Sequence, residues 1–179
     1  MRYFCRLILK LAGWRCEGQL PRGNKYLIVS APHTSMWDFV IGKLFYHGYG
    51  ISSKVLIKKE LFVFPVNILL RLMGGIPVDR KNRTNMIQKM VELFRDHDKF
   101  VLTITPEGTR EKVRYWKRGF YYIAERAGVP LLPGYCDYSR KVIGIGQFIY
   151  PTGDIEKDMK LIKGFFRGIV PRHPDKFEV

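Results

Sequence analysis

The stretch YLIVSAPHTSMWD at residues 26–38 sets the fold class of this chain. It begins with a short apolar run over 26–31 that Pro32 ends, the pattern of a buried strand. The residues from 35 to 47 then predict a helix that ends near Gly48. A buried strand that leads directly into a helix is the repeating unit of α/β folds.

The same alternation of apolar strands and amphipathic helices continues along the chain. Further strands are predicted over 55–57, 100–105, 129–133 and 141–150, and further helices over 64–73, 84–97, 118–127 and 155–169. A length of 179 residues suits one domain, and no linker or repeat divides the chain. We therefore predict a single α/β domain over 1–179, with a mainly parallel or mixed central sheet flanked by helices.

The first fourteen residues predict an amphipathic helix. Its apolar residues recur at helical spacing: Phe4, Leu7, Ile8, Leu11 and Trp14. Its basic residues gather on another face: Arg2, Arg6 and Lys10. The pattern suits either a helix packed on its own domain or a helix that lies on a membrane. The charge of the whole chain favours the second, so we predict that 1–14 docks on a membrane.

That charge is strongly positive. The chain has 31 Lys and Arg against 16 Asp and Glu, a net +15, which attracts nucleic acid, anionic lipid or an acidic carrier protein. The three cysteines show no CxxC spacing and the remaining histidines are scattered, so no disulfide, metal site or oxidising compartment is indicated. No uncharged apolar run reaches the roughly 18–20 residues of a membrane span, and no signal-peptide cleavage site appears. We predict a cytoplasmic protein, peripheral on the inner face of a membrane.

The first candidate for catalysis is the pair His33 and Asp38. In one regular helix, residues five apart point about 140° away from each other. An N-cap at Thr34 or Ser35 would instead leave His33 in the loop and Asp38 in the first turn, where its side chain leans back toward His33. The carboxylate could then orient the imidazole as a general base. The alternative is that Ser35 and Asp38 form a capping box with a purely structural role.

Two further segments follow predicted apolar elements. The segment TPEGTR at 105–110 follows a strand, where α/β sheets place their ligand sites. Gly108 permits close approach of the backbone, and Arg110 offers a fork suited to phosphate. The alternative for this segment is a polar turn that closes the strand. The second segment is GGIPVDR at 74–80, and its alternative is a glycine turn with a solvated Arg80. Lys58 taken alone would be a surface charge.

Together these segments closely resemble the glycerolipid (1-acylglycerol-3-phosphate or lysophospholipid) acyltransferase family. The His-x4-Asp signature of that family matches His33 and Asp38. Its other blocks are similar to residues 75–80, 107–110 and 129–133, and the segment before the second block to 58–62. The blocks occur in family order at family-like spacing within residues 27–135, which we take as the motif-bearing core.

The resemblance implies transfer of a fatty acyl group from an acyl-CoA or acyl-carrier-protein thioester to the hydroxyl of a lysophospholipid such as 1-acylglycerol-3-phosphate. It implies that His33 is the general base and that Asp38 orients it. The residues implied in binding the acceptor and its phosphate are Arg80, Arg110, Lys58, Glu107, Gly108 and Thr109. It implies no cofactor and no metal, and it names as partners a membrane lipid, the thioester donor and an anionic membrane surface.

Two alternatives remain at this stage. A member of the same family could act on a non-phosphate or amino-lipid acceptor. A nucleic-acid-binding module could use Tyr115, Trp116, Tyr121 and Tyr122 as a stacking surface among Arg114, Lys117 and Arg118. The helical spacing of apolar residues over 120–124 favours core packing instead, and such a module has no use for the His-x4-Asp pair. We therefore expect no nucleic acid as a partner.

Overall fold

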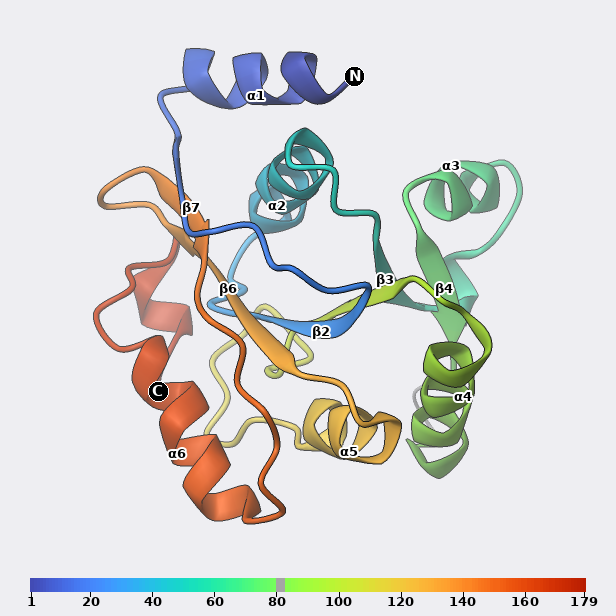
Figure 1. The fold of residues 1–179 in the computed structure, drawn as a ribbon. Coiled ribbons are helices and arrows are strands. Elements are labelled where there is room, and N and C mark those ends of the chain that lie inside the picture. The colour runs from blue at the N-terminus through green and yellow to red at the C-terminus, as the bar shows by residue number, and fades with distance from the viewer. Residues whose placement is uncertain (80–82) are drawn as a thin grey trace.

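The computed structural model describes residues 1–79 and 83–179, and these form one seven-stranded sheet with helices on both faces (Figure 1). The strands are β1 (Arg15–Glu17), β2 (Lys25–Ser30), β3 (Ser53–Lys58), β4 (Gly75–Val78), β5 (Phe100–Ile104), β6 (Leu131–Asp137) and β7 (Val142–Ile145). The α-helices are α1 (Arg2–Leu11), α2 (Met36–Gly48), α3 (Val66–Leu72), α4 (Arg83–Asp96), α5 (Gly119–Ala127) and α6 (Ile155–Phe165). Short 3-10 helices, η1 and η2, cover Lys59–Leu61 and Pro174–Lys176. The predicted α/β fold is confirmed.

The sheet is mixed, with the order β1-β7-β6-β2-β5-β3-β4. β6, β2, β5, β3 and β4 run parallel, β7 is antiparallel to β6, and β1 is parallel to β7. In the centre, Leu27 of β2 pairs with Leu102 of β5 on one side and with Leu131 of β6 on the other. The carboxyl ends of β2, β5 and β6 therefore lie side by side, where α/β proteins bind their ligands.

Two apolar cores, one on each face, hold the sheet between its helices. Leu27 and Val29 of β2 face the core under α4, α5 and α6, while Tyr26 and Ile28 face the core under α1 and α2. The four side chains are at most 3 % exposed. Because β2 is covered on both faces, its sequence is a continuous apolar run instead of an alternating one, as is usual in parallel sheets.

The observed elements differ from the predicted ones at the sheet edges and the helix ends. β1 and β4 were not predicted, since they are only 3 and 4 residues long and Gly75 and Pro77 indicated a turn. Pro77 is tolerated because β4 is an edge strand. Of the strand predicted over 141–150, only the residues of β7 form a regular strand. Ile149 forms one isolated bridge with Leu131. The last helix, predicted over 155–169, ends at Phe165.

The N-terminal helix packs on the domain through a face that its sequence pattern did not indicate. α1 ends at Leu11, so Trp14 lies outside it, and its buried residues are Cys5 and Leu9. Arg6 Nε donates a hydrogen bond of 2.7 Å to the carbonyl oxygen of Gly48 at the end of α2. Phe4, Leu7 and Leu11 remain exposed, which leaves an apolar face toward solvent. None of the described helices is long and apolar enough to cross a membrane.

This packing predicts different effects for two leucines of one helix. Leu9 is 1 % exposed and Leu7 is 51 % exposed. We expect Leu9→Ala to lower the free energy of unfolding by about 2–4 kcal/mol, because it opens a cavity between α1 and α2. Leu7→Ala should change it by no more than about 0.5 kcal/mol. Urea denaturation of both variants measures the difference, and equal effects would show that α1 does not pack as described.

Candidate active site

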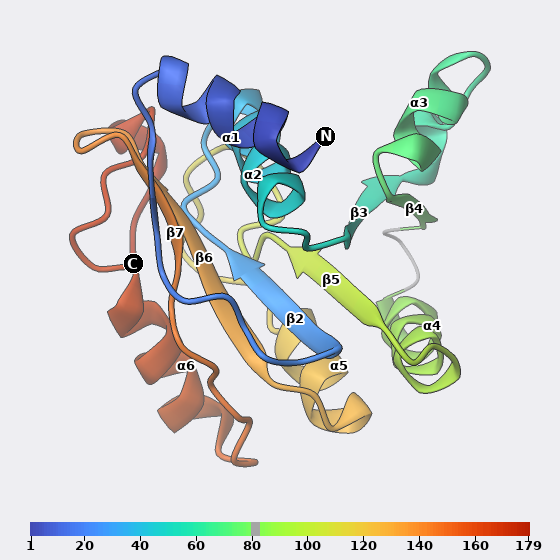
Figure 2. The same ribbon diagram turned by 45° about the horizontal axis from the view of Figure 1, so that its top comes forward.

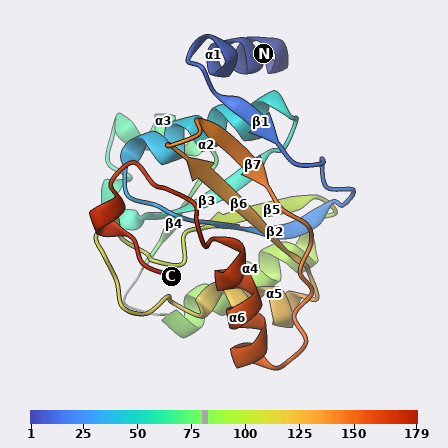
Figure 3. The ribbon, with the colours of Figure 1, turned by 90° about the vertical axis from the view of Figure 1, so that its left-hand side faces the viewer.

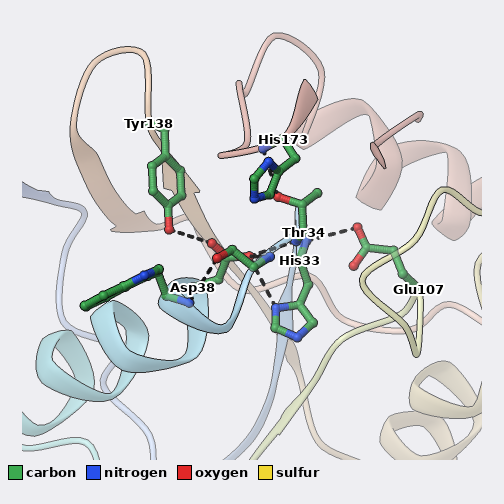
Figure 4. Close-up of polar contacts among 8 residues, drawn as sticks. His33, Thr34, Asp38, Glu107, Tyr138 and His173 are labelled. Atoms are coloured by element: carbon green, nitrogen blue, oxygen red, sulfur yellow. Dashed lines mark hydrogen bonds and ion pairs between the residues drawn. The ribbon is translucent and has the colours of Figure 1, made fainter. Parts of the chain in front are cut away.

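His33 and Asp38 lie at the start of α2, directly beyond the carboxyl end of β2. Ser35 is the N-cap of this helix and takes part in a capping box with Asp38, which confirms one of the two N-caps predicted. His33 stays in the loop, and its Nδ1 lies 3.4 Å from Asp38 Oδ2 (Figure 4). This ion-pair contact is longer than a regular hydrogen bond. The predicted approach of the two side chains is confirmed.

Asp38 combines the capping and the orienting geometry in one carboxylate. Its Oδ2 accepts hydrogen bonds of 2.8 Å from the backbone N–H groups of Thr34 and Ser35, and the same oxygen faces His33. Its Oδ1 accepts a hydrogen bond of 2.7 Å from Tyr138 Oη. The capping box proposed as an alternative is therefore present, and it holds the carboxylate in the position that meets the imidazole.

These donors also decide the charge of Asp38. Its side chain is only 7 % exposed, and burial alone would raise the pKa of the carboxyl group. The hydrogen bonds from His33, Tyr138 and the backbone of Ser35 outweigh burial, so the pKa of Asp38 lies below its ordinary value. Asp38 is therefore a carboxylate at neutral pH, the form that supports a protonated imidazole.

Tyr138 is a site residue that the sequence did not reveal. It follows β6, the strand next to β2, and its chain position lies 100 residues beyond Asp38. Its ring packs edge-on against the ring of Trp14, with centroids 5.1 Å apart. Burial and the adjacent Asp38 raise the pKa of Tyr138, so it remains a hydroxyl donor. The strand predicted over 129–133 ended too early to place Tyr138 at its carboxyl end, because β6 runs on to Asp137.

Glu107 joins this group from the neighbouring strand. It follows β5, and its Oε1 accepts a hydrogen bond of 3.1 Å from the backbone N–H of His33. Glu107 is 4 % exposed, and among the described residues its Oε2 has no hydrogen-bond partner. Burial and, to a smaller extent, the charge of Asp38 raise the pKa of Glu107 to about 7, against the lowering effect of the His33 hydrogen bond. The carboxyl group of Glu107 is therefore a weaker acid than that of Asp38.

The other predicted site residues lie along the same edge of the sheet, farther from His33. Gly108 has φ +67°, a conformation that favours glycine, and its N–H closes a turn on the carbonyl of Thr105. Thr109 and Arg110 follow it and are exposed. Lys58 is exposed at the end of β3, which is two strands from β2 and hence roughly 10 Å away along the edge. Arg80 lies outside the described residues.

The C-terminal segment also borders the site, which the sequence did not indicate. His173 donates its backbone N–H to Thr34 Oγ1 at 3.2 Å (Figure 4). The guanidinium of Arg172 lies 5.7 Å above the centre of the Trp37 ring. The carbonyl of Val170 accepts the N–H of Tyr138. The segment thus holds both the loop of His33 and the residue that binds Asp38.

The surface required for the nucleic-acid alternative is not assembled. Trp116 and Tyr121 are 5 % and 1 % exposed and belong to the core under α5, as the helical spacing of their neighbours predicted. Only Tyr115 and Tyr122 of the four rings reach the surface. In the described part of the chain, no three His, Cys, Asp or Glu side chains gather as metal ligands would.

Comparison with known proteins identifies the family of this chain. Residues 14–137 match the family model described as Acyltransferase, a range that includes the pair at 33 and 38 and the segment at 107–110. The chain is 30% identical over 156 residues to the 1-acyl-sn-glycerol-3-phosphate acyltransferase of Haemophilus influenzae, which covers 82% of this chain and 63% of that protein. It therefore spans slightly less than two thirds of that relative's length.

A solved structure shares the fold. The crystal structure of the 1-acyl-sn-glycerophosphate (LPA) acyltransferase PlsC from Thermotoga maritima has a TM-score of 0.67 and 20% identity, over 94% of this chain and 76% of that chain. This likeness extends the agreement from the motif-bearing core to nearly all of the sheet and its helices. The chain belongs to the acyltransferase family, as its resemblance to the glycerolipid acyltransferases predicted.

Proposed function

We propose that this protein transfers a fatty acyl group from a thioester to the hydroxyl of a lysophospholipid such as 1-acylglycerol-3-phosphate. The observation that carries the proposal is the position of Asp38, a buried carboxylate fixed by three hydrogen bonds with one oxygen 3.4 Å from His33 Nδ1. This is the arrangement of a general base with its orienting acid. The name of the Haemophilus influenzae relative supports the choice of acceptor.

In the proposed mechanism, His33 activates the acceptor. Asp38 faces Nδ1 and favours the tautomer that leaves the other ring nitrogen free to accept a proton. That nitrogen takes the hydroxyl proton as the oxygen attacks the thioester carbonyl and forms the new C–O bond. When the tetrahedral intermediate collapses, the C–S bond breaks and the thiolate takes the proton from His33. Neither an acyl-enzyme nor a cofactor or metal takes part.

The acceptor is proposed to bind along the edge from β2 toward β4. Arg80, with Arg110 and Lys58, would hold its phosphate, and Glu107, Gly108 and Thr109 would shape its pocket. Support comes from topology, because β5, β3 and β4 are parallel neighbours whose carboxyl ends share one edge with His33. The basic net charge of +15 suits an anionic donor, either acyl-CoA or acidic acyl-carrier protein.

Since the acceptor is a lipid, we also propose that the protein works at the cytoplasmic surface of an anionic membrane, bound in part through α1. The exposed face of this helix carries Phe4, Leu7 and Leu11, and Lys10 lies in its last turn. Such a face enters the headgroup boundary of a bilayer, and basic residues beside it are attracted to lipid phosphates. The packed face at Leu9 fixes the helix to the domain while the exposed face is free to bind.

Substitution of the pair separates catalysis from helix capping. We expect His33→Ala to lower kcat by about 10²–10⁴-fold, the usual contribution of a general base. Asp38→Asn keeps an oxygen for the cap but not the charge, so kcat should fall by at least about 10²-fold while the melting temperature stays near that of the wild type. Product formation from lysophosphatidate and acyl-CoA measures the kcat of both variants. A near-normal kcat in Asp38→Asn would leave Asp38 only its capping role.

Tyr138 should act through Asp38. Tyr138→Phe keeps the ring against Trp14 and removes only the donor to Asp38 Oδ1, so we expect kcat to fall about tenfold with both KM values unchanged. Tyr150→Phe, a change at a 67 % exposed ring, is the matched control. A loss of thermal stability without a loss of kcat would show that the hydroxyl only supports the fold.

The choice of acceptor depends on Arg80. We expect Arg80→Ala to raise the KM of a phosphate-bearing acceptor at least about tenfold and to leave the donor KM unchanged, with partial rescue by Arg80→Lys. Lys restores the charge but not the two parallel hydrogen bonds of guanidinium. Steady-state kinetics with each substrate varied in turn decide this. An unchanged acceptor KM would favour the family alternative, an acceptor without phosphate.

A further inference from the structure

The segment between β3 and β4 is an apolar element that the described residues leave uncovered. It consists of η1, the connecting loop and α3, residues 59–72, and we call it the α3 segment. Neither η1 nor α3 contains a buried residue. Its exposed large apolar side chains are Leu61, Val63, Phe64, Val66, Ile68, Leu69 and Leu72. A short helix that is apolar on most of its circumference is normally buried, in a core or in a membrane.

The α3 segment lies on the same side of the sheet as α1. Figures 1 and 2 show both helices beyond one face of the sheet with α2 between them, and Figure 3 shows the same side at a right angle. The start of α2 adds exposed Met36, Trp37 and Val40 to this side. On the opposite side, the described side chains of α4, α5 and α6 include only Tyr122 and Leu161 as exposed large apolar residues. Other exposed large apolar residues lie outside these helices: Leu20, Tyr115, Tyr150 and Val170. Most of the described apolar exposure is therefore in α1, the start of α2 and the α3 segment, as at an interaction surface.

The charges of this side indicate what covers it. Residues 1–16 contain four basic and no acidic residues, and 58–73 contain Lys58, Lys59 and Arg71 against the single acid Glu60. Lys59 is ion-paired with Asp79 of the neighbouring segment, so the excess positive charge comes mainly from the other basic residues. Arg71 is exposed in the last turn of α3, next to Leu72. Apolar residues surrounded by cations are the composition of an element that enters the headgroup region of an anionic bilayer. A second copy of this chain would bring its own net charge of +15 to this basic surface, and like charges disfavour such a contact.

We propose that the α3 segment inserts into an anionic membrane together with α1. The segment leaves the sheet at Lys58, the carboxyl end of β3, and returns through β4. It is therefore attached to the edge on which His33 and Glu107 lie, and its insertion brings that edge to the lipid surface. A lysolipid can then pass sideways from the bilayer to the site without crossing water. The choice of a lipid surface rests on the proposed function, and the second point of insertion goes beyond it.

Flotation of the full chain with vesicles tests the proposal. Phe64 and Leu72 are 81 % and 79 % exposed, so Phe64→Ser/Leu72→Ser should not disturb the fold. We expect this variant to bind vesicles of phosphatidylcholine and phosphatidylglycerol at least about tenfold more weakly, since two large apolar side chains no longer enter the bilayer. Phe4→Ser/Leu11→Ser should weaken binding similarly. Leu161→Ser on α6, 59 % exposed on the opposite side, should bind like the wild type.

A second variant, the oligomeric state and a water-soluble substrate distinguish loss of membrane binding from misfolding, self-association and loss of activity. Val63→Ser/Leu69→Ser replaces the first variant if its melting temperature falls. Wild-type binding by the α3 variants overturns the proposal, and so does a change in oligomeric state, which would make a second copy the occupant. Turnover of a water-soluble, short-chain lysophosphatidate should be unchanged in the α3 variants and reduced only when the acceptor is in vesicles. If the wild type turns over neither acceptor, the proposed function fails, and the flotation result still decides the membrane surface.

Discussion

A single buried carboxylate, that of Asp38, joins the parts of the chain on which the site depends. It receives two backbone N–H groups from the loop after β2, the hydroxyl of Tyr138 after β6, and the imidazole of His33. A carboxylate taken out of water is unfavourable unless its oxygens are hydrogen bonded, and charged acceptors form the stronger bonds. Because its folded pKa is lowered, the stability that Asp38 contributes is full above the unfolded pKa and is lost as pH falls through the folded pKa.

The pKa of Glu107, the second carboxyl group at this edge, is shifted in the opposite direction to that of Asp38, and the difference comes from their hydrogen bonds. Both oxygens of Asp38 accept hydrogen bonds. Glu107 is buried, its Oε1 accepts one backbone N–H, and its Oε2 has no hydrogen-bond partner among the described residues. Their pKa values therefore move apart, that of Asp38 downward and that of Glu107 to about 7. Neighbouring carboxyl groups with separated pKa values take different roles in many enzymes. Here Asp38 is suited to hold a charge, and Glu107 to fix the His33 loop in either protonation state.

The sequence predicted the parts of the site that depend on local geometry. His33, Ser35 and Asp38 lie within six residues, so the cap and the first turn of one helix determine how they meet. Tyr138 and the contact from His173 to Thr34 depend on chain separations of 100 and 139 residues, and no local pattern encodes them. β1 and β4 were not predicted for another reason. They are short edge strands, whose pairing is decided by the sheet and not by their own residues.

α1 shows what a helical pattern leaves undecided. The apolar spacing of its sequence predicted an amphipathic helix correctly, but it did not show which residues face the domain. Leu9, outside the predicted stripe, is the residue that packs against α2. When the apolar residues of an amphipathic helix outnumber those that can pack on the domain, only tertiary contacts decide which of them are buried.

The packing of α1 on the domain also connects its exposed face to the candidate active site. Arg6 ties α1 to the end of α2, the helix that begins beside Asp38, and Trp14 directly after α1 packs on Tyr138. Helix, tyrosine and carboxylate are therefore parts of one packed unit, so a bilayer that binds the outer face of α1 has a fixed orientation relative to His33. A soluble substrate would gain nothing from this arrangement. In the proposed reaction the arrangement matters, because the acceptor hydroxyl has to meet the imidazole while the acyl chain remains in an apolar phase.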